Sequence, residues 1–222
     1  AHLGYTTGIG NELEDQHGGG IDAMAAHGSK VVTGCQDSEI RVWDAETRTY
    51  ERSLSGHTDS VFSLFFVGYD TLLSGSRDSS VRIWDTKTWK CERILQETHG
   101  SSIYSVASLG GKIFSANAEG TIQVWDMLTW ERERVLEGHK NTHVESWGTI
   151  YQQAPVFSMR VDDARRRLIS ASADSSLRIW SIDSWECVAV LRGHERIIWA
   201  MALCRESGDL FSGGQDTHVH HW

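Results

Sequence analysis

Short apolar runs recur along the chain, and a turn rich in Gly, Asp and Ser separates each run from the next. Within residues 61–85 the runs VFSLFFV, TLLSGS and VRIWD follow one another, and a fourth run, CERIL, begins at residue 91. Short runs that are rich in β-branched and aromatic residues are typical of β-strands. The pattern therefore predicts four-stranded antiparallel meanders and an all-β chain.

The third run of each meander ends in a Trp, and this Trp recurs at nearly constant spacing. The intervals are 41, 41, 55 and 42 residues along the series Trp43, Trp84, Trp125, Trp180 and Trp222. The long interval is one 41-residue period plus an insertion of 14 residues, at about residues 140–154. Self-similarity at such a period indicates a repeat architecture, and we expect a single domain over residues 1–222.

Three polar positions recur together with the Trp. An acidic residue stands six places before it, as Asp37, Asp78, Glu119, Asp174 and Asp216. A hydroxyl stands ten places before it, as Thr33, Ser74, Ser115, Ser170 and Ser212. A His lies further upstream in every unit once the insertion is removed, as His17, His57, His99, His139 and His194.

These correlated positions resemble the WD-repeat (WD40) family, whose signatures are a Gly-His pair, a Trp-Asp pair and a period of 40 to 45 residues. Gly56-His57 matches the first pair and Trp84-Asp85 matches the second, and the resemblance covers about residues 13–222. Some units depart from the pattern, for example where Glu119 replaces Asp and Ser181 follows the Trp. The resemblance implies a β-propeller with five recognisable four-stranded blades.

The number of blades in the whole propeller stays open. A weak strand candidate at Ile9–Asp15 precedes the first His, and the chain stops at the third strand of the last unit. Propellers of this family close when an N-terminal strand completes the last blade, so a complete five-bladed ring is one alternative. A larger propeller, of which this chain forms a part, is the other.

The Ser, His and Asp of one unit invite comparison with a nucleophilic triad. The set recurs in all five units, however, whereas an active site needs one strained constellation with an oxyanion hole. In the family the acid bonds the His, the His bonds the hydroxyl, and the hydroxyl bonds the Trp indole. The resemblance therefore implies a structural network rather than an enzyme.

No cofactor or metal site is expected. Gly18–Gly20 lack the strand–helix context of a phosphate-binding loop. His218, His220 and His221 are the only metal-like cluster in the sequence, and alternation along a strand places His221 on the opposite face from the other two.

Composition narrows the class of partner. The chain has 21 Lys and Arg against 30 Asp and Glu, a formal net charge of −9, which disfavours direct binding of nucleic acid. No apolar stretch is long enough for a membrane span. The four cysteines are far apart without a CxxC pair, which favours reduced thiols and localisation in the cytoplasm, with the nucleus as an alternative.

One rim of the propeller, the top, is the expected contact surface. In the family this rim carries the connections into the first strand and those between the second and third strands. The residue after the first buried aliphatic of strand one is aromatic in four units, and polar side chains and the insertion add to the same rim. The expected partner-binding residues are Phe62, Tyr104, Phe157, Trp199, Arg77, Gln215, Trp147 and Tyr151.

The opposite, lower rim offers a weaker alternative. Trp89, Trp130 and Trp185 recur five residues after the Trp of their unit, which favours packing on the outer strand, and Arg165–Arg167 form a basic turn.

The sequence therefore predicts a non-enzymatic scaffold that docks peptides or protein domains within a larger polypeptide or assembly. Two alternatives remain. The chain could target substrates to a kinase or ubiquitin ligase, or it could be a structural subunit of a cytoskeletal or ribonucleoprotein particle.

Overall fold

The chain folds into β-strands joined by tight turns. A computed structural model describes residues 17–96, 100–140, 154–204 and 206–222. No helix long and apolar enough to cross a bilayer occurs in these residues. The expected strand at Ile9–Asp15 lies outside them.

The strands form five sheets in chain order, here called blades 1 to 5. Blades 1 and 2 consist of β1 (Ile21–His27), β2 (Lys30–Cys35), β3 (Ile40–Asp44), β4 (Thr49–Leu54), β5 (Val61–Val67), β6 (Thr71–Ser76), β7 (Ser80–Asp85) and β8 (Cys91–Gln96). Blade 3 consists of β9 (Ile103–Leu109), β10 (Lys112–Asn117), β11 (Thr121–Asp126) and β12 (Arg132–Glu137). Blades 4 and 5 consist of β13 (Val156–Asp162), β14 (Arg167–Ser172), β15 (Ser176–Ser181), β16 (Cys187–Arg192), β17 (Ile198–Leu203), β18 (Leu210–Gly214) and β19 (Val219–His221).

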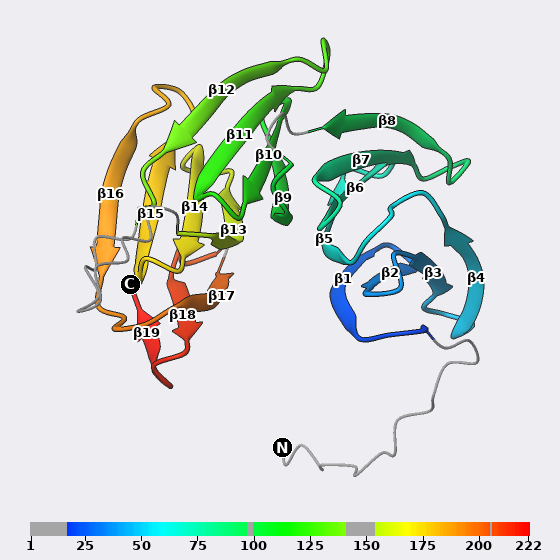
Figure 1. The fold of residues 1–222 in the computed structure, drawn as a ribbon, viewed down its shortest axis with the longest axis horizontal. Helices are drawn as coiled ribbons and strands as arrows, with labels where there is room; N and C mark the ends of the chain where they lie inside the picture. The colour runs from blue at the N-terminus through cyan, green and yellow to red at the C-terminus, as the bar shows by residue number, and fades with distance from the viewer. Residues whose placement is uncertain (1–16, 97–99, 141–153, 205) are drawn as a thin grey trace.

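Every blade is an antiparallel meander in which consecutive strands pair. Blades 1 to 4 have four strands, and blade 5 has three in the part of the chain that the structure describes. The first strands pack side by side, β1 on β5, β5 on β9, β9 on β13 and β13 on β17. Figure 1 shows the resulting arc of blades, with blade 1 at one end and blade 5 at the other.

The hydrophobic core lies between the blades rather than at a single centre. Between blades 1 and 2, Val32 and Ile40 of one sheet pack against Leu64, Leu72 and Trp84 of the next. The same arrangement recurs at the following interfaces. Blades 2 to 4 therefore bury both of their faces against neighbours, and neighbouring blades stabilise one another.

Candidate functional site

A chain of hydrogen bonds runs through the interior of blade 2. The indole N–H of Trp84 donates to Ser74 Oγ at 2.9 Å, and the same oxygen lies 2.7 Å from His57 Nε2. His57 Nδ1 in turn lies 2.8 Å from Asp78 Oδ2. Ser74 is completely buried, and two side chains already occupy its oxygen. The hydroxyl therefore has no access to a substrate carbonyl, and the set stabilises the blade.

Blades 4 and 5 repeat this chain with nearly the same distances. His139 lies 2.7 Å from Ser170 Oγ and 2.9 Å from Asp174 Oδ2. Trp180 donates to the same Ser170 oxygen at 2.9 Å. In blade 5 the His194 ring lies 2.7 Å from Asp216 and 2.8 Å from Ser212, and Trp222 donates to Ser212 at 2.9 Å.

Blades 1 and 3 differ in detail. In blade 1 His17 lies 2.6 Å from Thr33 Oγ1, and Trp43 donates to that oxygen at 2.9 Å. Arg41 contacts both His17 and Asp37, and the His17–Asp37 distance lengthens to 3.4 Å. In blade 3 Trp125 donates to Ser115 at 3.0 Å. His99, the expected partner of Ser115 and Glu119, lies outside the described residues.

Burial and hydrogen bonding shift the pKa of the acidic residue of this network in opposite directions. Burial alone would raise the pKa of Asp78, but hydrogen bonds from His57 and Ser80 outweigh it and hold the pKa well below its usual range. Burial lowers the pKa of His139, and the neighbouring Asp174 opposes this shift only in part. A neutral His beside an ionised Asp is therefore the resting state of the blade 4 network.

The packing of these side chains also explains the Gly that precedes the His. A Cβ on Gly56 would come within 2.7 Å of Arg82 Nη1, and a Cβ on Gly138 would come within 3.0 Å of Arg178 Nη1. The rim of the Trp ring lies beside the same Arg in both blades. At these two positions a larger residue would displace the guanidinium that packs on the Trp ring.

The first strand of every blade contains a β-bulge near its start. In β5, Val61 pairs with Ser76 and Ser63 pairs with Gly75, so Phe62 is the extra residue between two paired positions. The extra residue is Asp22 in β1, Tyr104 in β9, Phe157 in β13 and Trp199 in β17. A bulge re-aims the side chain of its extra residue away from the ladder, and this explains why these side chains share one register on the top rim.

The four aromatic bulge residues form a continuous row of ring contacts, which we call the aromatic wall. The ring centroids of Phe62 and Tyr104 are 5.3 Å apart, and those of Tyr104 and Phe157 are 5.0 Å apart. Trp199 follows Phe157 at 4.7 Å and is 48% exposed. These spacings lie within the range of favourable aromatic pairs. The wall therefore spans blades 2 to 5 as one unbroken row of contacting rings.

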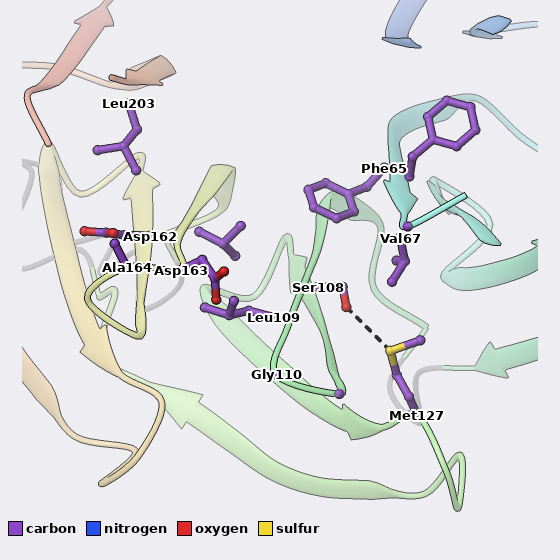
Figure 2. Close-up of a pocket in the computed structure, with 14 residues that line it drawn as sticks. Phe65, Val67, Ser108, Leu109, Gly110, Met127, Asp162, Asp163, Ala164 and Leu203 are labelled. Carbon is purple, nitrogen blue, oxygen red and sulfur yellow. Dashed lines mark hydrogen bonds between the residues drawn. The ribbon is translucent and has the colours of Figure 1, made fainter. Parts of the chain in front are cut away.

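A cavity of about 720 Å³ opens between blades 2, 3 and 4 at the opposite, lower rim (Figure 2). Phe65, Val67 and Leu109 supply apolar walls, and the Asp162–Ala164 turn closes one side. Ser108 contacts the Met127 sulfur at 3.5 Å across the cavity wall. This cavity could not be predicted from the sequence, because its residues come from separate blades that meet only in the assembled arc.

Comparison with known proteins identifies the repeats. A family model described as WD domain, G-beta repeat matches residues 12–44, 48–85, 89–126, 130–181 and 185–222. The chain belongs to the WD40 repeat family. The resemblance seen in the sequence and the predicted all-β propeller fold are confirmed.

Single relatives match only part of the WD40 chain. It is 34% identical to transducin beta-like protein 3 of Bos taurus over 55 residues. The matched segment covers 25% of this chain and 7% of the relative. It is 36% identical to cell division control protein 4 of Candida albicans over 56 residues. The matched segment covers 25% of this chain and 8% of the relative.

A solved structure shares the fold over most of the chain. The WD40 β-propeller domain of Doa1 superposes with a TM-score of 0.78 at 21% identity, over 93% of this chain and 64% of that structure. This WD40 chain therefore spans less than two thirds of the relatives and of the structure that it matches.

The remaining expected top-rim residues are spread around the aromatic wall of the WD40 propeller. Arg77 is 61% exposed and lies 3.8 Å from the Asp59 carboxylate. Gln215 is also exposed. Trp147 and Tyr151, in the insertion, lie outside the described residues.

The recurring lower-rim tryptophans pack between blades. Trp89, Trp130 and Trp185 have φ values of 58°, 63° and 63°, the left-handed region in which Gly is favoured. Each lies against the apolar cluster between its own blade and the preceding one. Trp185 also lies 5.9 Å from the guanidinium of Arg134. These contacts explain why a bulky residue occupies a strained position.

The histidines near the end of this WD40 chain do not gather as a group of three. His220 packs at 4.3 Å from the ring of His194 and at 5.4 Å from that of Trp222. His194, Asp216 and His220 have ligand atoms within 4.8 Å of one another. Both nitrogens of His194 are already bonded to Asp216 and Ser212, so a metal ion would have to break the network of blade 5.

Proposed function

We propose that this chain is a non-catalytic interaction domain that docks a peptide or protein domain on its aromatic wall. WD40 propellers generally mediate protein interactions, and the family assignment supports this class of function. The single observation that carries the finer proposal is the unbroken stack from Phe62 to Trp199, built on bulged residues at one rim.

The wall has the composition of a binding hot spot. Aromatic side chains and Arg dominate the energy of protein interfaces, because they bury a large area at low entropic cost. Trp199 presents an exposed ring at one end of the wall, and the backbone N–H of Arg77 donates to the backbone oxygen of Ser60, two residues before Phe62, at the other end. Mutual stacking holds the rings in place before a partner arrives, which reduces the ordering cost of binding.

Charge favours a protein partner over nucleic acid or an anionic membrane. The net charge of −9 repels phosphate backbones and acidic lipid surfaces. Four free cysteines suit a reducing compartment, so we place the protein in the cytoplasm or nucleus, in a complex with other proteins.

A peptide-display selection against the purified chain tests the proposal. Binders recovered with the wild-type chain should bind Trp199→Ala and Arg77→Ala at least about thirtyfold more weakly, the loss typical of a buried anchor. Arg166→Ala, at a lower-rim ion pair with Asp183, serves as the matched control and should change affinity little. Circular dichroism confirms that each variant folds.

The opposite pattern would contradict the proposal. If folded Trp199→Ala and Arg77→Ala variants retain the binders while Arg166→Ala loses them, the lower rim is the contact surface. If the selection yields no binder that depends on either rim, the aromatic wall is not a docking site.

A further inference from the structure

Arg160 breaks the pattern of the innermost strands. It pairs with Ile169, and the residues at the same register position in the other four blades are Ala25, Phe65, Ala107 and Ala202. The fold of a blade therefore does not require a charged side chain at this position. Only blade 4 places a permanent positive charge there.

The side chain faces the space between the innermost strands of the open arc, which we call the channel. Arg160 and residues of β1, β5, β9 and β17 line a cavity of about 470 Å³. Its lining is otherwise apolar or hydroxylic, with Met24, Ser63, Ser105, Met159 and Met201 among its residues, and contains no Asp or Glu from the described chain. The cavity shares Phe65, Val161 and Leu203 with the lower-rim cavity, so the two cavities are adjacent.

Within the described residues no carboxylate neutralises Arg160. Its guanidinium donates to the backbone oxygen of Met159 at 2.7 Å. The side chain is accessible from the channel, yet the surrounding protein lowers its pKa by desolvation. A guanidinium partly removed from water without a counter-charge is costly, and an oxyanion that pairs with it would recover that cost.

Two hydroxyl groups that line the same cavity strengthen this preference. Ser63 Oγ accepts a hydrogen bond from the backbone N–H of Val106 at 3.0 Å, and Ser105 Oγ accepts one from Met159 at 3.1 Å. A hydroxyl that accepts in this way keeps its own proton as a donor. Two hydroxyl donors and a guanidinium, with no lining carboxylate, form an environment that suits an anion.

We propose that Arg160 binds the carboxylate of an acidic side chain that a docked protein segment inserts into the channel. The proposal rests on the proposed function, because the segment is held by the aromatic wall. Phe157 precedes Arg160 by three residues on β13, about 10 Å along the strand. A segment that binds Phe157 and Trp199 and continues along β13 therefore brings its next residues to the level of Arg160 on that strand.

A small carboxylate tests the site without any docked segment. In the ¹⁵N-labelled chain, the Nε–Hε resonance of Arg160, assigned by its loss in Arg160→Gln, is followed while sodium glutarate is added at constant ionic strength. We expect a saturable shift of this resonance and none of comparable size at Arg93, an exposed Arg on the outer strand of blade 2. If both resonances shift equally or not at all, the channel is not an anion site.

Selected peptides test the full proposal. Peptides recovered with the wild-type chain should carry Asp or Glu at a fixed position, and binding of such a peptide should weaken about tenfold or more in Arg160→Gln. The same peptide with Gln at that position should bind the wild-type chain and Arg160→Gln equally. Because Ala and Phe occupy the equivalent positions elsewhere, we expect Arg160→Gln to fold, and its melting temperature checks this.

The two tests separate the possible failures. Trp199-dependent binders without an acidic preference would overturn the role of Arg160 and leave the docking function intact. A selection without binders, together with a saturable glutarate shift, would overturn the docking function and with it the docked segment as the source of the carboxylate.

Discussion

The hydroxyl of Ser74 lies between two rings, with the Trp84 indole nitrogen at 2.9 Å and His57 Nε2 at 2.7 Å. These contacts join the connection that precedes β5 to the second and third strands of blade 2, β6 and β7. Both rings are buried, so each has lost its water partners on folding. The stability of the blade therefore depends on this one oxygen.

We expect Ser74→Ala to destabilise the chain by about 1–3 kcal/mol, because it leaves the buried polar groups of His57 and Trp84 without a partner. For a chain of this size that loss corresponds to a decrease of roughly 2–12 °C in melting temperature. Thermal unfolding followed by circular dichroism measures it.

Ser207→Ala removes an exposed hydroxyl of a turn and serves as the control, for which we expect little change. Should Ser74→Ala melt like the control, the hydrogen-bond chain contributes nothing to stability. A hydrolytic activity that disappears in Ser74→Ala at an unchanged melting temperature would instead favour a catalytic role.

The network also predicts how stability depends on pH. Burial alone would raise the pKa of Asp174, but its hydrogen bonds with His139 and Ser176 outweigh burial and lower the pKa below 3.8. The unfolded chain then binds more protons, so this contribution is present above pH 3.8 and is lost as the pH falls through the folded-state pKa. Burial lowers the pKa of His139 below 6.5, so its contribution begins to decrease below pH 6.5 and is lost as the pH falls through the folded-state pKa.

Asp174→Asn should therefore lower the melting temperature at pH 7, and the difference from the wild type should shrink as the pH falls below 3.8. Melting curves at pH 7, 5 and 3 measure the trend. Asp183→Asn, at an exposed carboxylate of the lower rim, is the control and should show little difference at pH 7. A difference for Asp174→Asn that stays constant over this range would show that its charge does not contribute.

Much of the blade could be predicted because its determinants are local and repeat. The spacing of residues such as Trp43 and Trp84 predicted the repeat and its strands, and the resemblance supplied the partners of Ser74. The bulge at Phe62 could not be predicted, because an extra residue in one strand is visible only when the register with its partner strand is known. The position of Arg160 in a cavity could not be predicted either, because most of the other lining residues come from four other strands that meet only in the folded chain.

Left-handed turn positions give a matched pair of substitutions. Arg48 and Trp130 have φ values of 60° and 63°, which cost a non-Gly residue about 1–2 kcal/mol. The Arg48 side chain is exposed, whereas Trp130 packs against the core between blades 2 and 3. We expect Arg48→Gly to stabilise the chain by up to about 1 kcal/mol, because relief of this strain exceeds the additional entropy that Gly loses on folding.

Trp130→Gly relieves the same strain but removes the packing, and we expect it to destabilise the chain by about 2–4 kcal/mol. Urea unfolding of both variants measures the two effects. If both substitutions stabilise the chain, the contacts of Trp130 contribute less than its backbone strain costs.

The two ends of the arc differ from its interior in burial. Phe211 of blade 5 is 39% exposed, whereas Val32, Leu73, Phe114 and Ile169 are buried at the same position of blades 1 to 4. Val219 is 77% exposed at a position where the other blades bury Ile40, Val81, Ile122 and Leu177. In blades 1 to 4 the next blade covers this face.

Blade 1 shows the complementary feature. Met24 is 67% exposed, whereas Leu64, Val106, Met159 and Met201 are buried at the same position, where the preceding blade covers them. The open face of blade 5 is thus equivalent to the face that each earlier blade packs against its successor. The open face of blade 1 is equivalent to the face that each later blade packs against its predecessor. We infer that a second copy can occupy either face, by placing its blade 1 on the blade 5 of the first.

Self-association of the 222-residue chain is the expected consequence. The contact is head-to-tail, a geometry that joins copies into rings or open chains, and the mass measured by sedimentation velocity should rise with concentration. Phe211→Ser with Val219→Ser should reduce this association, because it removes the apolar surface that drives it. Ile94→Ser, at an exposed residue of the outer strand of blade 2, should leave it unchanged. A chain that stays monomeric at every concentration, or that associates equally in both variants, would show that these two faces do not meet.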